Sequence, residues 1–331
     1  MRYLAQVELM ALKFQCKPFS FRLSRVLQTA QGVVEERQGW LLRLEDCAGR
    51  CGWGEVAPMD VAGLKACGDC LVQLRLAPTR LELEDGMAFW PAPLAFGVGA
   101  ALAELDGLVG SVAAGGWLAA PASAVLLPAG QPLLKALDSM LERVPSAADP
   151  FTVKWKVAVA PDALERRLLL QLLERLPEHA RFRLDGNGGW DRSVVSWWVE
   201  RCLQDPRLEW LEQPLPAGDL EGLRALAQQV PVALDESLVL DPSLRESWSG
   251  WQVRRPLLDG DPRPLLRGLQ EGVGYRMLST AFETGIGRRW LHHLAALQHQ
   301  GPTPVAPGLA PGWCPDGPLF SADPEVVWAA A

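Results

Sequence analysis

The sequence predicts an α/β protein in which a parallel barrel of strands and helices carries a smaller accessory domain. After about residue 117, short apolar runs alternate with amphipathic stretches, which is typical of a parallel βα array. Acidic residues end three successive runs, at intervals of 27 and 23 residues, about the length of one βα repeat. The length of 331 residues suits a barrel of roughly 200 to 250 residues with an additional domain.

Composition narrows the functional class. The chain is 49% hydrophobic and 21% charged, which is ordinary for a soluble globular protein. A net charge of −7 provides no basic footprint for nucleic acid. No apolar run reaches the length of about 18 residues that a membrane span needs. The first residues include Arg2, Gln6, Glu8 and Lys13, so they lack the apolar core of a signal peptide. We therefore expect a cytoplasmic protein.

Seven cysteines are an odd number at low density, unlike the pattern of a disulfide-stapled secreted domain. Four of them form a C-x3-C…C-x2-C arrangement that could hold a structural zinc ion, namely Cys47, Cys51, Cys67 and Cys70. Free, partly buried thiols are the preferred interpretation.

The first 117 residues are predicted to form an α+β domain. An antiparallel meander is expected from the runs at 7–16 and 33–49, a turn at 48–54, and 55–59. A helix of small residues at 95–106 should pack closely on a neighbour. Residues 111–123, rich in Ala, Gly and Pro, read as a linker. We predict one domain over 1–117, together with part of 310–331, and a barrel domain over 118–309.

Eight strand candidates fit a closed barrel; they are 123–128, 151–159, 181–185, 208–212, 231–236, 251–256, 275–280 and 303–307. Amphipathic helices are expected between them, for example at 162–176 and 192–204.

Asp185, Glu212 and Asp235 are the acidic residues at the ends of three of these strands. The carboxyl ends of parallel barrel strands meet at one mouth, which is where such proteins place their active sites. Three carboxylates that converge there favour a hard divalent cation, most plausibly Mg²⁺. A single acidic residue at a strand end is more often a cap or turn residue. Because three acidic residues recur at nearly the same spacing, we favour a metal site over three separate caps or turns.

Lys154 and Lys156 lie in a run that alternates strictly, so both should point to the same side of their strand. With the apolar side packed on the outer helices, that side is the barrel interior. Mutual repulsion and partial burial are expected to lower a lysine pKa there, which suits a general base. Taken alone, the two lysines would more often be exposed edge-strand charges.

Five motifs in order carry a family resemblance: KWK at 154–156, LDGNGGW at 184–190, WLEQPL at 210–215, ALDESL at 233–238 and LSTAFETGIG at 278–287. They resemble the strand-end motifs of the enolase superfamily, and within it the muconate-lactonizing subgroup. Residues 52–58 and 96–105 resemble the capping domain of a dehydratase of menaquinone and phylloquinone biosynthesis in that superfamily. The resemblance covers about residues 50–310. It implies a modified TIM barrel, (β/α)₇β, with an α+β capping domain.

The resemblance also implies a site. Asp185, Glu212 and Asp235 would hold Mg²⁺, which Mn²⁺ can replace, and Lys156 would transfer the proton while Lys154 tunes it electrostatically. The implied activity removes a proton α to a carboxylate of a small-molecule substrate, and in the dehydratase the same lysine then assists loss of a hydroxyl group from the same face. Candidate substrate contacts are Asn187, Ser279 and Thr280, although a turn role for Asn187 and ordinary strand roles for the other two remain alternatives.

Arg255 departs from the superfamily pattern. The sixth strand usually carries a lysine before a proline, but this chain has VRRP. Arginine stays protonated at any useful pH, so it cannot act as a second base. Two-base racemases and epimerases are therefore disfavoured, and Arg255 can lie as a fixed cation over a substrate ring. A register shifted by one residue would instead turn Arg254 inward, but the position directly before the proline favours Arg255.

Two alternatives to the dehydratase remain open at this point. One is another activity of the superfamily, namely muconate cycloisomerase, N-succinylamino acid racemase or dipeptide epimerase. The other is a barrel that binds a ligand without catalysis.

Overall fold

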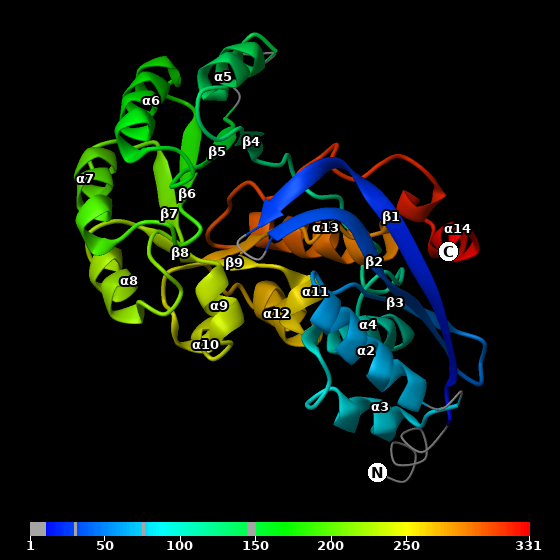
Figure 1. Cartoon of the computed structure of the whole chain (residues 1–331). Helices are drawn as coiled ribbons and strands as arrows, with labels where there is room; N and C mark the ends of the chain where they lie inside the picture. The colour runs from blue at the N-terminus through cyan, green and yellow to red at the C-terminus, as the bar shows by residue number, and fades with distance from the viewer. Residues whose placement is uncertain (1–10, 30–31, 75–76, 144–149) are drawn as a thin grey trace.

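Two sheets organise the part of the chain that the computed structural model describes, residues 11–29, 32–74, 77–143 and 150–331. One is a three-stranded antiparallel sheet, and the other is a seven-stranded sheet whose neighbouring strands are parallel. In Figure 1 the antiparallel sheet lies beside the curled parallel sheet, with helices α5 to α8 along the outer side of the latter. We call β1–β3 with α2–α4 the cap, and β4–β10 with their helices the barrel.

The cap sheet has the order β1-β2-β3, with β1 at Lys13–Thr29, β2 at Gly32–Glu45 and β3 at Cys51–Val56. The predicted antiparallel meander is confirmed, but its first strand was placed too early. It begins at Lys13 and runs well past residue 16 because Phe19 and Phe21 are also buried, in a second apolar cluster on the face opposite Phe14. Pro18 is tolerated because β1 is an edge strand. Residues 7–10 of the predicted strand lie outside the described residues.

The cap helices are α2 (Val61–Gln73), α3 (Arg80–Gly86) and α4 (Ala92–Leu105). Helix α4 confirms the helix predicted at 95–106, and it starts earlier because Pro93 is favourable in a first turn. Its small residues let it approach β3 closely: a Cβ added at Gly54 would lie 1.9 Å from the carbonyl oxygen of Gly97. Close backbone packing therefore joins α4 to the sheet.

The barrel strands follow the chain order across the sheet, from β4 at one end to β10 at the other. They are β4 (Val125–Leu127), β5 (Thr152–Lys156), β6 (Arg181–Asp185), β7 (Leu208–Glu212), β8 (Val232–Leu234), β9 (Trp251–Arg254) and β10 (Arg276–Leu278). Each falls within a predicted strand.

The helices of the barrel alternate with these strands. They are α5 (Leu133–Leu141), α6 (Asp162–Arg175), α7 (Arg192–Cys202), α8 (Leu220–Ala227), α9 (Glu236–Leu240), α10 (Leu244–Ser247), α11 (Pro256–Asp259), α12 (Arg263–Gln270) and α13 (Gly285–Gln300), followed by the 3₁₀ turn η1 (Pro318–Phe320) and α14 (Pro324–Ala330). Helices α6 and α7 confirm the predictions at 162–176 and 192–204.

The eighth predicted strand, 303–307, is wrong as a strand. Prolines at 302, 304 and 307 have no N–H to donate, so a regular ladder cannot form. The segment nevertheless links the two ends of the sheet. Gly308 N donates to Leu278 O at 2.8 Å, after β10, and Ala124 N donates to Pro307 O at 2.9 Å, before β4.

Strand β5 shows how the barrel sorts its side chains. Val153, Trp155 and Val157 are buried in one apolar cluster with Leu169 of α6 and Trp198 of α7. Since alternate residues face opposite sides, Lys154 and Lys156 face the interior, as the alternation predicts.

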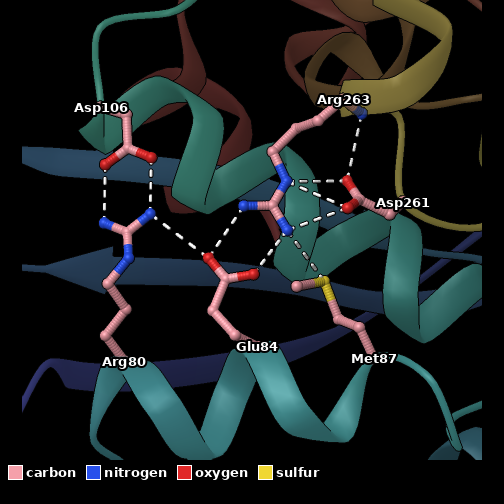
Figure 2. A network of polar contacts seen from close by, with 6 residues as sticks. All are labelled: Arg80, Glu84, Met87, Asp106, Asp261 and Arg263. Atoms are coloured by element: carbon pink, nitrogen blue, oxygen red, sulfur yellow. Dashed lines mark hydrogen bonds and ion pairs between the residues drawn. The ribbon is translucent and has the colours of Figure 1, made fainter. Parts of the chain in front are cut away.

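Cap and barrel are joined by buried and partly buried polar contacts. In Figure 2 the Arg263 guanidinium, at the start of α12, bonds to Glu84 of α3 at 2.7 and 2.8 Å and to Asp261. Arg80 of α3 in turn bonds to Glu84 and to Asp106, which follows α4. The C-terminal helix α14 also contacts the cap, because the Trp53 and Trp328 rings lie 5.6 Å apart. The domain limits at residues 117 and 309 stay a prediction.

Within the described ranges, none of the helices is long and apolar enough to cross a membrane.

Gly54→Ala should lower the free energy of unfolding by at least about 2 kcal/mol, because the new methyl group would overlap the backbone of α4. Urea denaturation measures this loss. Gly218→Ala is the control, since a Cβ there meets nothing within 4 Å and should change stability by less than about 0.5 kcal/mol. Equal losses in both variants would contradict the close packing of α4 on β3.

Candidate active site

The carboxyl ends of three adjacent strands bring the predicted acidic residues to one rim. Asp185 ends β6, Glu212 ends β7, and Asp235 directly follows β8. Asp185 is the register partner of both Lys156 on β5 and Glu212 on β7. The three carboxylate residues are 7%, 0% and 4% exposed, respectively. Burial of three acidic groups side by side requires positive partners.

Lys154 is the first of these partners. Its Nζ lies 2.8 Å from Asp185 Oδ2 and 2.6 Å from Glu212 Oε1. Burial acts to lower the pKa of Lys154, but the Asp185 and Glu212 carboxylates prevail and raise it above its usual range. The expectation that mutual repulsion of the two lysines lowers the Lys154 pKa is therefore wrong. Lys154 is a cation committed to two carboxylates.

Lys156 stands at the end of the same strand, next to Asp185 in the sheet register. It is half-buried and shares the interior side of β5 with Lys154. The structure thus places a second lysine at the rim, beside Lys154.

Arg255 is the cation on the opposite side of the rim. It follows β9 directly, and its Nη1 forms an ion pair with Asp235 Oδ1. Arg254 instead pairs with Asp259 at 2.7 Å. The shifted register is thereby excluded, since Arg255 is the residue that faces the carboxylates. Burial opposes the charged form of Arg255, but Asp235 raises its pKa above the usual range.

The three carboxylates act on one another electrostatically. Burial raises the pKa of Glu212, Lys154 lowers it, and the charges of Asp185 and Asp235 raise it again. Lys154 and Arg255 form ion pairs with these carboxylates. Across the described ranges, no group of three or more His, Cys, Asp or Glu side chains is arranged to hold a metal ion.

The chemistry of the rim still fits a hard divalent cation. All three candidate ligands are carboxylates, and two further oxygens beside them, Asn187 Oδ1 and Glu236 Oε2, are buried without a hydrogen-bond partner among the described residues. An oxygen-rich, electronegative site of this kind suits Mg²⁺. The roles of Asp185, Glu212 and Asp235 as ligands stay a prediction.

Two residues of the rim escaped the sequence reasoning. Glu236 Oε1 accepts a bond from Asn187 Nδ2 at 2.9 Å, and burial together with Asp235 and Asp185 raises the pKa of Glu236 to about 7. Gln213 Oε1 accepts bonds from the backbone N–H groups of Asp235 and Ser237, at 3.1 and 3.0 Å. Both residues directly follow a predicted ligand in the sequence, which was the available signal. Gln213 thereby ties the end of β7 to the end of β8.

The predicted substrate contacts separate in space. Asn187 belongs to the rim: its backbone N donates to Asp185 Oδ1 at 3.2 Å, and its φ of +43° is a left-handed conformation. Ser279 and Thr280 instead follow β10. The Ser279 hydroxyl donates to Gly308 O at 3.4 Å, and the Thr280 hydroxyl donates to Glu283 at 2.6 Å. Contact of any of the three with substrate stays a prediction.

The four cysteines considered for zinc lie in the cap, away from this rim. Cys47 is exposed before β3 and Cys51 begins that strand, whereas Cys67 is buried within α2 and Cys70 lies on the same helix. All four are free thiols, and they do not form a group that could hold a metal ion in the described part of the chain.

Comparison with known proteins agrees with this geometry. A family model described as Enolase C-terminal domain-like matches residues 141–246. The o-succinylbenzoate synthase of Thermosynechococcus vestitus is 34% identical over 297 residues, which cover 86% of this chain and 88% of that protein. The chain belongs to the o-succinylbenzoate synthase family.

The Enolase C-terminal domain-like model places the chain in the enolase superfamily, and solved structures share its fold. The crystal structure of o-succinylbenzoate synthase from Thermosynechococcus elongatus, complexed with Mg in the active site, has a TM-score of 0.77 and 31% identity, and the match covers 96% of this chain and 100% of that one. The L-Ala-D/L-Glu epimerase of Bacillus subtilis has a TM-score of 0.72 at 18% identity, covering 93% and 92% of the two chains, which shows the shared fold. These matches confirm the resemblance that the motifs indicate.

Lys154→Met should lower the free energy of unfolding by about 3 kcal/mol without divalent cations, because two buried carboxylates lose their shared cation. Urea denaturation in EDTA measures this. The control is Lys65→Met, which breaks an exposed ion pair with Asp69 and should leave stability unchanged. A stable Lys154→Met protein would show that the carboxylates do not depend on this lysine.

Proposed function

We propose that this chain catalyses the o-succinylbenzoate synthase reaction, the dehydration of 2-succinyl-6-hydroxy-2,4-cyclohexadiene-1-carboxylate to o-succinylbenzoate. One observation carries the proposal. The rim has Lys156, at the end of β5, on one side and an arginine paired with Asp235 on the other. This arrangement offers one amine that can serve as a base and one permanent cation, which suits a reaction that takes place on a single face of the substrate.

In the proposed mechanism, the neutral amine of Lys156 takes the proton from the ring carbon that bears the carboxylate. The C–H electron pair is left on the substrate. The resulting ammonium group of Lys156 then gives its proton to the departing hydroxyl on the same face, so that the C–O bond breaks and water leaves. The ring becomes aromatic and Lys156 returns to the amine.

The other rim residues hold charges in place. Lys154 stays a cation between Asp185 and Glu212, which leaves the proton transfers to Lys156. Arg255 stays protonated beside Asp235 and offsets negative charge on the substrate without exchanging a proton. Asp185, Glu212 and Asp235 would hold Mg²⁺, and the bound ion would stabilise negative charge on the substrate carboxylate.

The finer parts of the proposal follow from this reaction. Mn²⁺ is expected to replace Mg²⁺, because it also accepts an oxygen-only ligand set. The product is a precursor in menaquinone or phylloquinone biosynthesis. The free cysteines agree with a reducing, cytoplasmic location.

Purified protein with Mg²⁺ should aromatise the cyclohexadiene substrate, which is followed by absorbance, and EDTA should abolish turnover. Lys156→Ala should lower kcat by about 10²- to 10⁴-fold through loss of the acid–base group. Lys135→Ala, an exposed lysine on α5, is the matched control and should retain full activity. Undiminished turnover in Lys156→Ala would refute the assigned base, and a wild type without turnover would favour a ligand-binding barrel.

Arg255 distinguishes the dehydratase from two-base relatives. With N-succinyl amino acids in D₂O, we expect no racemisation, since only one face of the substrate meets a base. Chiral chromatography and mass spectrometry follow configuration and deuterium together. Inversion of configuration with deuterium uptake would instead support an N-succinylamino acid racemase activity.

A further inference from the structure

A buried glutamate of the cap fastens the loop that follows barrel strand β10. Glu55, near the end of β3, is fully buried. Its carboxylate accepts bonds from the Thr284 backbone N at 3.0 Å, the Thr284 hydroxyl at 2.5 Å and the Gly287 backbone N at 2.9 Å. Thr284 is the N-cap of α13, and Gly287 lies in its first turn. One cap side chain therefore holds the start of a barrel helix.

A second carboxylate holds the same loop from within. Glu283, 2% exposed, accepts bonds from the Thr280 hydroxyl at 2.6 Å and from the Ala281 backbone N at 2.7 Å. At the centre of the loop, Phe282 has a φ of +64°, a conformation that a bulky residue adopts only when its surroundings impose it. Residues 279–284 thus have one shape, set from both sides.

Arg37 and Gly287 lie close to the Glu55 carboxylate and limit the positions that it can take. Arg37 of β2 is 1% exposed and donates to the carbonyl oxygens of Ala57 and Pro58, just after β3. Burial lowers the pKa of Arg37, while the charges of Glu55 and Glu283 raise it. Both carboxylates are therefore near enough to Arg37 to interact with its charge. A Cβ at Gly287 would lie 2.8 Å from Glu55 Oε2, so a larger residue there would displace the carboxylate.

The loop also touches the candidate active site. It starts at the carboxyl end of β10, on the side of the barrel where active sites form. Ser279 N donates to Arg254 O at 2.9 Å, directly before Arg255, which pairs with Asp235. Movement of the loop would therefore be transmitted to the strand end that carries Arg255.

We propose that Glu55 is a positioning residue for substrate binding, which fastens the 279–284 loop as the wall of the active site on the side of the cap. This inference rests on the proposed function. It assigns to Glu55 no part in proton transfer, so its loss should weaken substrate binding and leave the chemical step almost intact.

The chain provides a matched control in Glu104. This residue of α4 is half-buried and bonds to the same barrel helix, to Arg289 at 2.6 Å and Trp290 Nε1 at 3.2 Å. Its partners lie farther along α13 than Thr284 and Gly287, away from the loop. Glu55→Gln and Glu104→Gln therefore remove one cap carboxylate each. The first loses bonds to the start of α13, and the second loses bonds farther along that helix.

The experiment compares both variants with wild-type protein in Mg²⁺, by steady-state turnover and by hydrogen–deuterium exchange of the peptide that contains 279–287. For Glu55→Gln we expect KM to rise at least about tenfold, kcat to stay within about threefold, and exchange in that peptide to accelerate. Glu104→Gln should lower the melting temperature but keep the wild-type KM. Thr284→Val should raise KM as Glu55→Gln does. Thr284→Ser, which keeps the hydroxyl, should have the wild-type KM.

An unchanged KM in Glu55→Gln and Thr284→Val, or the same rise in Glu104→Gln, would overturn the inference. A kcat loss without a KM change would overturn it as well, since Glu55 would then affect chemistry. Failure of the proposed function has a different signature, because the wild type itself would not turn over. In that case unaltered exchange at 279–287 in Glu55→Gln would still refute the positioning role.

Discussion

Lys154 between Asp185 and Glu212 is the contact on which the candidate site depends. Parallel strands of matched length bring acidic residues to the same rim, where they are buried and repel one another. A fixed ammonium group at 2.6 and 2.8 Å offsets much of that cost, and Arg255 does the same for Asp235. The rim is thus stable with its own cations. If these carboxylates hold a divalent ion, as proposed, its binding would be coupled to the positions of Lys154 and Arg255.

The packing of β5 explains why the lysines are available for this role. Val153 and Trp155 pack between the sheet and the helices. Because alternate residues of a strand face opposite sides, Lys154 and Lys156 face the barrel interior. The same division recurs on β6, where Phe182 and Leu184 join the outer cluster while Arg183 and Asp185 face inward. Arg183 lies over the Trp210 ring at 4.0 Å and bonds to Ala306 O at 2.7 Å. The interior cations therefore also help to hold the proline-rich segment that links β4 and β10.

The cap contributes to the barrel through buried carboxylates. Glu55 and Glu104 both reach α13 from elements that pack closely on one another through glycines. Because Glu55 is fully buried and Glu104 half-buried, their hydrogen-bond partners are confined to few arrangements, which favours one relative position of cap and barrel. The match to o-succinylbenzoate synthase covers most of the chain, and therefore includes both the cap and the barrel.

The sequence by itself determined the alternation of strands and helices, the placement of acidic residues at strand ends, and the orientation of Lys154 and Lys156, because these follow from local periodicity and chain order. It also allowed the family to be anticipated, since the motifs are contiguous. It misplaced the start of β1 and assigned a strand to 303–307, where prolines remove the ladder donors.

Only the tertiary structure decided which charges meet. The raised pKa of Lys154, the pairing of Arg255 with Asp235, and the partners of Glu236 and Gln213 depend on distances between different strands. The hold of Glu55 on α13 joins residues more than 200 positions apart. Electrostatic effects of this kind fall steeply with distance and depend on burial, and a linear pattern of residues contains neither quantity.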